Sequence, residues 1–186
     1  MAERFASLSP ELAQWWCEQP LFFVATAPAG DAGHVNLSPK GYDTLRVLAP
    51  DRVAYLDLTG SGVETIAHLR ENGRITLMAC AFAGNPRISR IYGRGTVHPL
   101  GSGAFDALAP SFPDLPGRRS IIEVDVERVT TSCGYAVPLM DLVGDRDRLL
   151  DWATKKGEGG IVEYWGTRNG TSIDGLPGLD RPEPTS

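Results

Sequence analysis

The chain has 186 residues and a mass of 20.1 kDa, which fits one domain with or without a tail. Its net charge of −5 and its pI of about 5.2 argue against a nonspecific nucleic-acid binder and against a polybasic membrane binder. No apolar run reaches the roughly 20 residues of a membrane span, and the N-terminus lacks the apolar stretch of a secretory signal, so we expect a cytoplasmic protein without nucleic-acid or membrane partners.

The first part of the chain predicts a helix followed by two strands. Ser9 is a good N-cap for a helix over 9–19, and Pro10 fits its first position, where the missing N–H costs nothing. Residues 21–27 form a short apolar run of β-formers, and a turn rich in Gly and Pro follows. Residues 34–42 alternate between polar and apolar, and Pro39 indicates an edge or an end of that strand.

The remainder predicts further strands and short helices. Strands are expected over 52–58, 74–82, 87–97 and 120–129. Helices are expected over 63–72 with Gly73 as stop, over 103–109, and from Asp145 as cap to Lys156 with Gly157 as stop. Six strands without a βαβα rhythm predict a mostly β protein with peripheral helices, an antiparallel barrel or sandwich rather than a doubly wound sheet. Residues 166–186 are rich in Gly, Pro and polar residues, and we expect the last eight to be disordered.

The strand over 34–42 is the first candidate site. His34, Asn36, Ser38 and Lys40 share one face, while Val35, Leu37 and Pro39 share the other. The polar face offers hydrogen-bond donors, an acceptor and a cation to a ligand. The alternative is the solvated face of an outer strand.

The run L-T-G-S-G-V-E-T-I over 58–66 is the second candidate. Glycines between a strand and a helix leave backbone N–H groups free to hold a phosphate, and the helix dipole assists. The run is neither a P-loop nor the dinucleotide fingerprint. The alternative is a plain turn in which Thr59 or Ser61 caps the helix.

Three further features are weaker. Arg90 and Arg94 lie on one face of the strand over 87–97. They either form cross-strand ion pairs with acidic residues of the strand over 120–129, or one of them binds a ligand phosphate. Cys133 has no nearby base in the sequence, so we expect a small buried thiol rather than a nucleophile. The scattered histidines and cysteines predict no metal site.

Five segments follow one another over roughly residues 20–138: LFFVATA, HVNLSPKG, RVAYLDLTGSGVETIAHLRENGRITL, RISRIYGRGTV and IIEVDVERV. This succession resembles the pyridoxamine 5′-phosphate oxidase-like proteins, which are flavin-binding antiparallel split β-barrels. The segment YWGTRNGTSIDGLPGL over 164–179 resembles the tail of one branch of that family. The resemblance implies a split-barrel domain over 1–165 and a C-terminal tail over 166–186.

The resemblance also implies a cofactor, a partner and a site. In the family, FMN lies in a groove at a homodimer interface, and the residues here that match its phosphate site or lie beside it are Asn36, Ser38, Lys40, Thr59, Ser61, Gly62 and Thr65. Two cations that the oxidases often carry after the serine are replaced by Gly62 and Val63, and Glu64 follows, so we expect reduced FMN affinity.

The tail departs from the true oxidases as well. It lacks their Arg-Leu-Ala-Pro-type motif, so pyridoxamine phosphate itself is not the expected substrate. The regular apolar spacing of Ile173, Leu176 and Leu179 predicts that the tail packs back on the barrel or across the dimer. The resemblance to the oxidases implies that Asn169, Ser172 and Asp174 then lie on the substrate side of the flavin. The alternative is a docking strap without contact to the ligand. The chain is thus expected to be an FMN-dependent oxidoreductase acting on a small molecule. The alternatives are a non-catalytic flavin carrier and a binder of deazaflavin or haem in the same groove.

Overall fold

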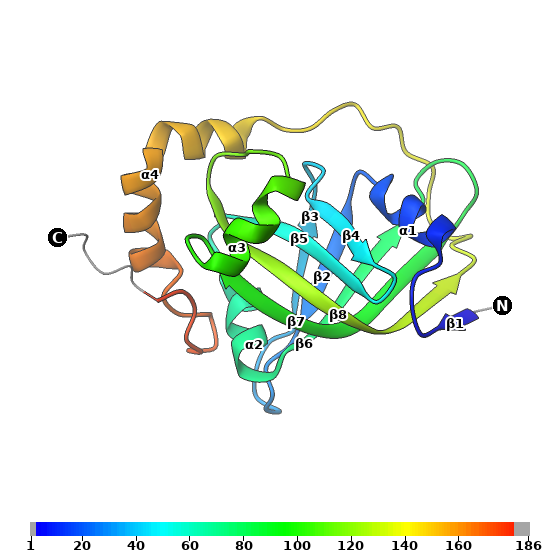
Figure 1. Ribbon diagram of the computed structural model, residues 1–186, viewed down its shortest axis with the longest axis horizontal. Helices are drawn as coiled ribbons and strands as arrows, with labels where there is room; N and C mark the ends of the chain where they lie inside the picture. The colour runs from blue at the N-terminus through cyan, green and yellow to red at the C-terminus, as the bar shows by residue number, and fades with distance from the viewer. Residues whose placement is uncertain (1–2, 181–186) are drawn as a thin grey trace.

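The computed structural model describes residues 3–180, and its centre is a strongly curved antiparallel sheet (Figure 1). Eight strands form the sheet in the order β3-β2-β6-β7-β8-β5-β4, and β1 pairs with the far end of β8. The strands are β1 (Glu3–Phe5), β2 (Phe22–Thr26), β3 (Asn36–Lys40), β4 (Leu45–Ala49), β5 (Arg52–Leu58), β6 (Arg74–Cys80), β7 (Ile88–Pro99) and β8 (Arg118–Ser132). The expected antiparallel sheet is confirmed.

A short link forces the sheet to curl into a split barrel. Strands β3 and β4 stand at opposite ends of the strand order, yet residues 41–44 alone connect them. The two ends of the sheet therefore lie near each other, and Lys40 Nζ of β3 reaches Asp57 Oδ1 of β5 at 2.9 Å across the gap. This gap between the two ends holds the candidate site.

The barrel interior is filled by the inward faces of the strands and closed at one end by helix α1 (Pro10–Cys17). Ser9 caps α1 as predicted, since its Oγ accepts from the Leu12 N–H at 3.2 Å. Trp16 is buried at 1% exposure, and its indole N–H donates to the buried Ser89 hydroxyl at 2.9 Å. Burying an aromatic side chain of this size contributes about 1.5–3 kcal/mol to stability.

The other helices lie around the barrel, and the first of them also contributes Ile66 and Leu69 to its buried core. Helix α2 (Glu64–Asn72) ends at Gly73, whose φ of 71° is left-handed as the sequence predicted. Helix α3 (Gly103–Leu108) continues into a 3₁₀ turn over Ala109–Ser111. Helix α4 (Arg148–Arg168) lies at the far left of Figure 1.

Three details of the expected elements were wrong. Strands β1 and β4 were not predicted: β1 is exposed throughout, and Leu45 alone of the β4 residues is fully buried, so neither shows a clear alternation. Asp145 does not cap the last helix, because that helix begins at Arg148 after Asp147. Gly157 breaks the helix at φ 65°, but a second helical stretch follows directly and runs to Arg168.

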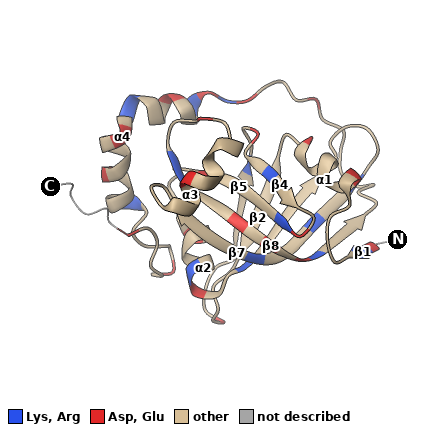
Figure 2. Ribbon diagram, viewed as in Figure 1, with Lys and Arg blue, Asp and Glu red and all other residues tan. Residues whose placement is uncertain are grey.

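No helix within residues 3–180 is long and apolar enough to cross a membrane. Acidic and basic residues are interspersed over the ribbon in the view of Figure 2, without a continuous basic stripe. Functional chemistry is therefore better sought in local pockets than in a broad charged face.

Candidate functional site

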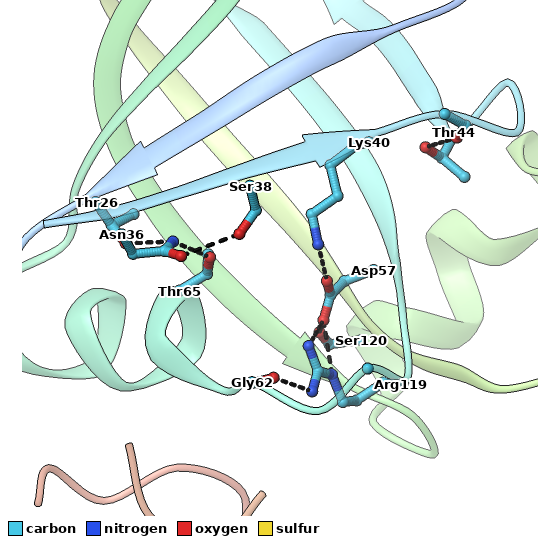
Figure 3. Close-up of polar contacts among 12 residues, drawn as sticks. Thr26, Asn36, Ser38, Lys40, Thr44, Asp57, Gly62, Thr65, Arg119 and Ser120 are labelled. Atoms are coloured by element: carbon cyan, nitrogen blue, oxygen red, sulfur yellow. Dashed lines mark hydrogen bonds and ion pairs between the residues drawn. The ribbon is translucent and has the colours of Figure 1, made fainter. Parts of the chain in front are cut away.

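The two candidate segments meet at one pocket. Strand β3 forms one wall, and the turn between β5 and α2 forms the other (Figure 3). The pocket has a volume of about 250 Å³ and is lined by Asn36, Ser38, Pro39, Lys40, Leu58, Gly60, Gly62, Glu64, Thr65 and Arg119. Five of the seven predicted cofactor residues are thus together, although they come from two separate parts of the sequence.

Strand β3 presents its polar face inward and its apolar face outward. Asn36, Ser38 and Lys40 are half-buried toward the pocket. In contrast, Val35 and Leu37 are 75% and 63% exposed. The interpretation as a solvated outer face is therefore wrong for these three polar residues, and the exposed face of β3 is the apolar one. It is right for His34, which precedes β3 and whose side chain is 77% exposed.

Asn36 organises the polar wall of the pocket. Its Nδ2 donates to Thr65 Oγ1 at 2.9 Å and to Thr26 Oγ1 at 3.1 Å, and its Oδ1 accepts from Ser38 Oγ at 3.0 Å. The Asn36 amide hydrogens are fully used within the protein. The Thr65 hydroxyl accepts the Asn36 bond and keeps its own hydrogen to donate to a ligand.

Behind this wall lies His68, which is completely buried. Its Nδ1 is 2.9 Å from Thr26 Oγ1, and its Nε2 has no partner within the described residues. Burial lowers the pKa of His68, so the ring is neutral near pH 7. His68 supports the wall rather than lining the pocket.

The N-terminus of α2 opens onto the pocket without a side-chain cap. The N-cap position is Val63, which has no side chain that could bond to the first turn. Thr59 and Ser61 do not cap this helix, so the plain capped turn predicted as the alternative is absent. Within residues 3–180, no acceptor is found for the backbone N–H groups of Val63, Glu64 and Thr65. Unpaired N–H groups at a helix start are ready to bind an anion.

Two cations and a buried carboxylate form the floor of the pocket (Figure 3). Asp57 is fully buried and pairs with Lys40 at 2.9 Å and with Arg119 at 2.8 Å. Burial raises the pKa of Asp57, but the charges of Arg119 and Lys40 outweigh it and lower that pKa to about 2. Glu64 adds a second negative charge at the rim of the pocket. The two positive charges of Lys40 and Arg119 and the two negative charges of Asp57 and Glu64 therefore sum to zero.

Thr59 and Ser61 do not line the pocket. Thr59 Oγ1 accepts from the indole N–H of Trp165 at 2.9 Å, which ties the turn to α4. Ser61 is exposed, and its carbonyl accepts from Asn169 Nδ2 at 3.4 Å. Both residues contribute to the shape of the turn.

The tail after α4 packs on the same barrel. Asn169 is fully buried, and its side chain bonds to Arg119 at 3.2 Å and to the Gly60 carbonyl at 3.1 Å. Ser172 stays within the tail, where its hydroxyl accepts from the Leu176 N–H at 3.1 Å. Leu179 packs against the core. The prediction that the last eight residues are disordered is therefore wrong for residues 179–180, and the other residues of that prediction, 181–186, lie outside the described range.

Asp174 fastens the tail to the loop before β3. Its carboxylate accepts from the His34 backbone N–H at 2.8 Å and is 2.7 Å from His34 Nδ1. The backbone bond from His34 lowers the pKa of Asp174. Of the three predicted substrate-side residues, Asn169 alone has a side-chain hydrogen bond to a residue that lines the pocket, within the described residues.

Three other candidates lie away from the pocket. Arg94 pairs with Glu127 at 3.2 Å on the outer surface, as cross-strand pairing predicted, and Arg90 does not line the pocket. Cys133 is exposed rather than buried, because β8 ends at Ser132. No group of acidic, cysteine or histidine side chains within residues 3–180 could hold a metal ion.

A larger hollow of about 830 Å³ lies between the end of α1, the β6–β7 turn and residues 140–146. Apolar and charged side chains of both signs line it, including Trp15, Arg87 and Asp145. It contains none of the inward polar residues of β3 and no helix N-terminus. The smaller pocket therefore has the more specific chemistry.

Arg119 and Asp57 are the site residues that sequence reasoning missed. Asp57 is the one charged residue on the inward face of β5, after Val53 and Tyr55, which is a readable signal. Arg119 follows Arg118 directly, and nothing in the sequence distinguishes the buried arginine from its half-buried neighbour.

The fold and the pocket define a split-barrel protein with a small polar pocket between β3 and the start of α2. A sequence profile of the family described as "Pyridoxamine 5'-phosphate oxidase" matches residues 8–133. The chain is 42% identical to the pyridoxamine 5'-phosphate oxidase family protein ustO of Aspergillus flavus, over 94% of this chain and 77% of that protein. The chain therefore belongs to the pyridoxamine 5'-phosphate oxidase family.

Solved structures share the fold at low sequence identity. A variant of the HupZ protein of Group A Streptococcus is 20% identical with a TM-score of 0.52, over 67% of this chain and 99% of that one. A Lactobacillus delbrueckii protein, assigned provisionally as a pyridoxamine 5'-phosphate oxidase, is 23% identical with a TM-score of 0.51, over 67% and 94%. These likenesses confirm the split-barrel fold.

Proposed function

We propose that this protein binds FMN, with the phosphate in the pocket between β3 and the start of α2, and that it is a flavin-dependent oxidoreductase for a small molecule. The observation that carries the proposal is the uncapped N-terminus of α2 facing the Lys40 ammonium in one pocket. Free backbone N–H groups and an ammonium are the donors that a phosphate dianion prefers.

The donors left over after internal bonding fit a phosphate. Lys40 uses one of its three N–H bonds on Asp57, so two remain for a ligand. Thr65 adds a hydroxyl hydrogen, and Gly60 has nothing within 4 Å of where a Cβ would stand, so its backbone is open to approach. When bound, the flavin would supply the redox chemistry, and the chain would hold and orient it.

The size of the pocket indicates that the flavin ring lies outside it. Pockets for ligands of this size typically measure about 300–1,000 Å³. A volume of about 250 Å³ accommodates the phosphate and part of the ribityl chain. The ring then needs a second surface, and a second copy of the chain supplies it in this proposal.

The outer face of the sheet supports a homodimer. Strand β3 stands at the end of the strand order, and its outward Leu37 is level with Ala25, Thr76 and Tyr92 on the next three strands. The neighbouring row contains Pro39, Phe23, Met78 and Arg90. Such a continuous, mainly apolar face is typical of an interface between copies.

The pocket favours a flavin over haem. Haem iron in proteins needs an axial side chain, most often a histidine. None of the three histidines lines the pocket: His34 bonds to Asp174, His68 lies behind Thr26, and His98 pairs with Glu123 at 2.8 Å. Deazaflavin would need the same phosphate donors and is separated from FMN by its absorption spectrum.

Fluorescence titration with FMN and with riboflavin tests the phosphate site, because the two ligands differ by the phosphate alone. Lys40→Ala should weaken FMN binding by roughly tenfold to a hundredfold, which corresponds to about 1.5–3 kcal/mol, and should change riboflavin binding little. Lys155→Ala is the matched control, since Lys155 is exposed on α4. Equal FMN affinity in Lys40→Ala and Lys155→Ala would refute the phosphate site. Bleaching of the bound flavin by a reductant and its recovery with an added oxidant would favour an enzyme over a carrier.

The tail remains a proposed wall on the substrate side. Asn169 bonds to Arg119, and Arg119 lines the phosphate pocket, so the tail lies close enough to influence a bound ligand. A chain truncated after Gly166 should still bind FMN but with an altered flavin spectrum. An unchanged spectrum would leave the tail as a docking strap.

A further inference from the structure

Asp57 is a charged side chain in an unusual place. It lies at the inner end of β5, two residues after the buried Tyr55, and has no exposed surface. A buried carboxylate is costly unless cations and hydrogen bonds compensate it. The cationic partners of Asp57 therefore indicate its role.

Its two cationic partners are not equivalent. The Arg119 guanidinium donates hydrogen bonds to Asp57 Oδ2, to the Gly62 carbonyl at 2.9 Å and to Asn169 Oδ1 at 3.2 Å. At most one of its five N–H bonds is left for a ligand. Arg119 is thus held by the turn and the tail whether or not a ligand is bound.

Lys40, in contrast, has Asp57 as its one hydrogen-bond partner within the described residues. The Lys40 side chain is 20% exposed and lines the pocket, whereas the carboxylate of Asp57 is fully buried beneath it. An incoming phosphate must therefore share the Lys40 charge with a carboxylate already in contact with it. The two anions repel each other across one ammonium group.

We propose that Asp57 is an internal counter-ion of the phosphate pocket, which holds Lys40 in the ligand-free protein and lowers the affinity for phosphate-bearing ligands. This inference rests on the proposed function, because it concerns the same pocket. It also gives a physical reason why Lys40 and Arg119, whose side chains are only 20% and 4% exposed, can lie close together before any ligand binds.

The test is the preference for FMN over riboflavin, measured as the ratio of the two dissociation constants. Asp57→Asn keeps the shape of the side chain and removes its charge. The preference should rise about tenfold in Asp57→Asn, because Lys40 is no longer shared. The unfolding temperature should fall in the ligand-free variant, and FMN should raise it further than in the wild-type protein.

Glu64→Gln is the matched control. It removes the same charge from the rim of the same pocket, but Glu64 does not contact Lys40: its Oε1 accepts from the Ile173 N–H at 3.3 Å. A smaller rise in preference is expected. An equal rise in both variants would overturn the role of the Lys40 contact.

Asp57→Asn combined with Arg119→Gln covers the case in which the single variant does not fold, because it removes one cation together with one anion. The double variant should prefer FMN at least as strongly as the wild-type protein does. A lower preference in either Asp57 variant would show that Asp57 positions the cations for the ligand, which overturns the proposal and leaves the phosphate site intact. Equal affinities of the wild-type protein for FMN and riboflavin would overturn both the site and the proposal.

Discussion

Replacing Arg119 should be among the most damaging single changes in the barrel. Arg119 is 4% exposed and neutralises Asp57, which is fully buried. In Arg119→Met the carboxylate keeps Lys40 alone, and both the Gly62 carbonyl and Asn169 Oδ1 lose their bonds to Arg119. Breaking a buried ion pair by removing one partner costs about 3–5 kcal/mol.

The neighbouring Arg118 provides a control with the same chemistry. It pairs with Asp114 at 2.8 Å, but its side chain is 32% exposed and that of Asp114 is 87% exposed. Exposed pairs of this kind contribute about 0–1 kcal/mol, so Arg118→Met should be nearly neutral.

Urea unfolding followed by tryptophan fluorescence measures both variants. The free energy of unfolding should fall by about 3–5 kcal/mol in Arg119→Met, equivalent to a loss of roughly 10 °C in Tm. A difference between the two variants of less than about 1 kcal/mol, which is all that an exposed pair accounts for, would refute the argument that the ion pair beneath the pocket holds the barrel together.

Three further outcomes are expected. Gly178→Ala should loosen the tail, because a Cβ there would stand 2.3 Å from the Asn169 carbonyl oxygen. Gly170→Ala is the control, since a Cβ there would stand 3.8 Å from its nearest neighbour. Thermal melts should give a lower Tm for Gly178→Ala, and equal Tm values would contradict the packing of the tail. The pKa of Asp57 is lowered from 3.8 to about 2, so the stability that its charge contributes is complete above pH 3.8 and is lost as the pH falls toward 2. Over that range the free energy of unfolding of the wild-type protein should fall by about 2 kcal/mol more than that of Asp57→Asn. The same pH dependence in both proteins would contradict this role of Asp57. Leu37→Glu should convert a dimer of about twice 20.1 kDa into monomers in sedimentation, and an unchanged mass would exclude the outer face of β3 from the interface.

Local features of the fold could be predicted from the sequence because they depend on neighbouring residues. Ser9 and Pro10 start a helix, Gly73 ends one, and the alternation on either side of Ser38 separates two faces. The joining of β3 with the start of α2 in one pocket was predicted from the resemblance to the family.

Which face points inward could not be predicted, because it depends on the curl of the whole sheet. Alternation over 34–42 shows two faces but does not say that the apolar face is the exposed one. The arginine beneath the pocket was missed for a related reason. Arg119 is 62 positions from Asp57 in the sequence, and the bond forms because β5 and β8 pair in one particular register.

The tail shows the same limit. Of the apolar series that predicted packing, Leu179 packs on the core, but Ile173 is 73% exposed. The contact of Asp174 with His34, which fastens the tail, spans 140 positions. Only the folded chain shows that the loop before β3, the turn before α2 and the tail meet on one side of the barrel.

A crystal structure of the protein reconstituted with FMN tests the central claim most directly. The phosphate should lie within hydrogen-bond distance of Lys40 Nζ, Thr65 Oγ1 and the first backbone N–H groups of α2, with the ring between two copies of the chain. A phosphate bound elsewhere, for example in the hollow of about 830 Å³ beside residues 140–146, would contradict the assignment of the site.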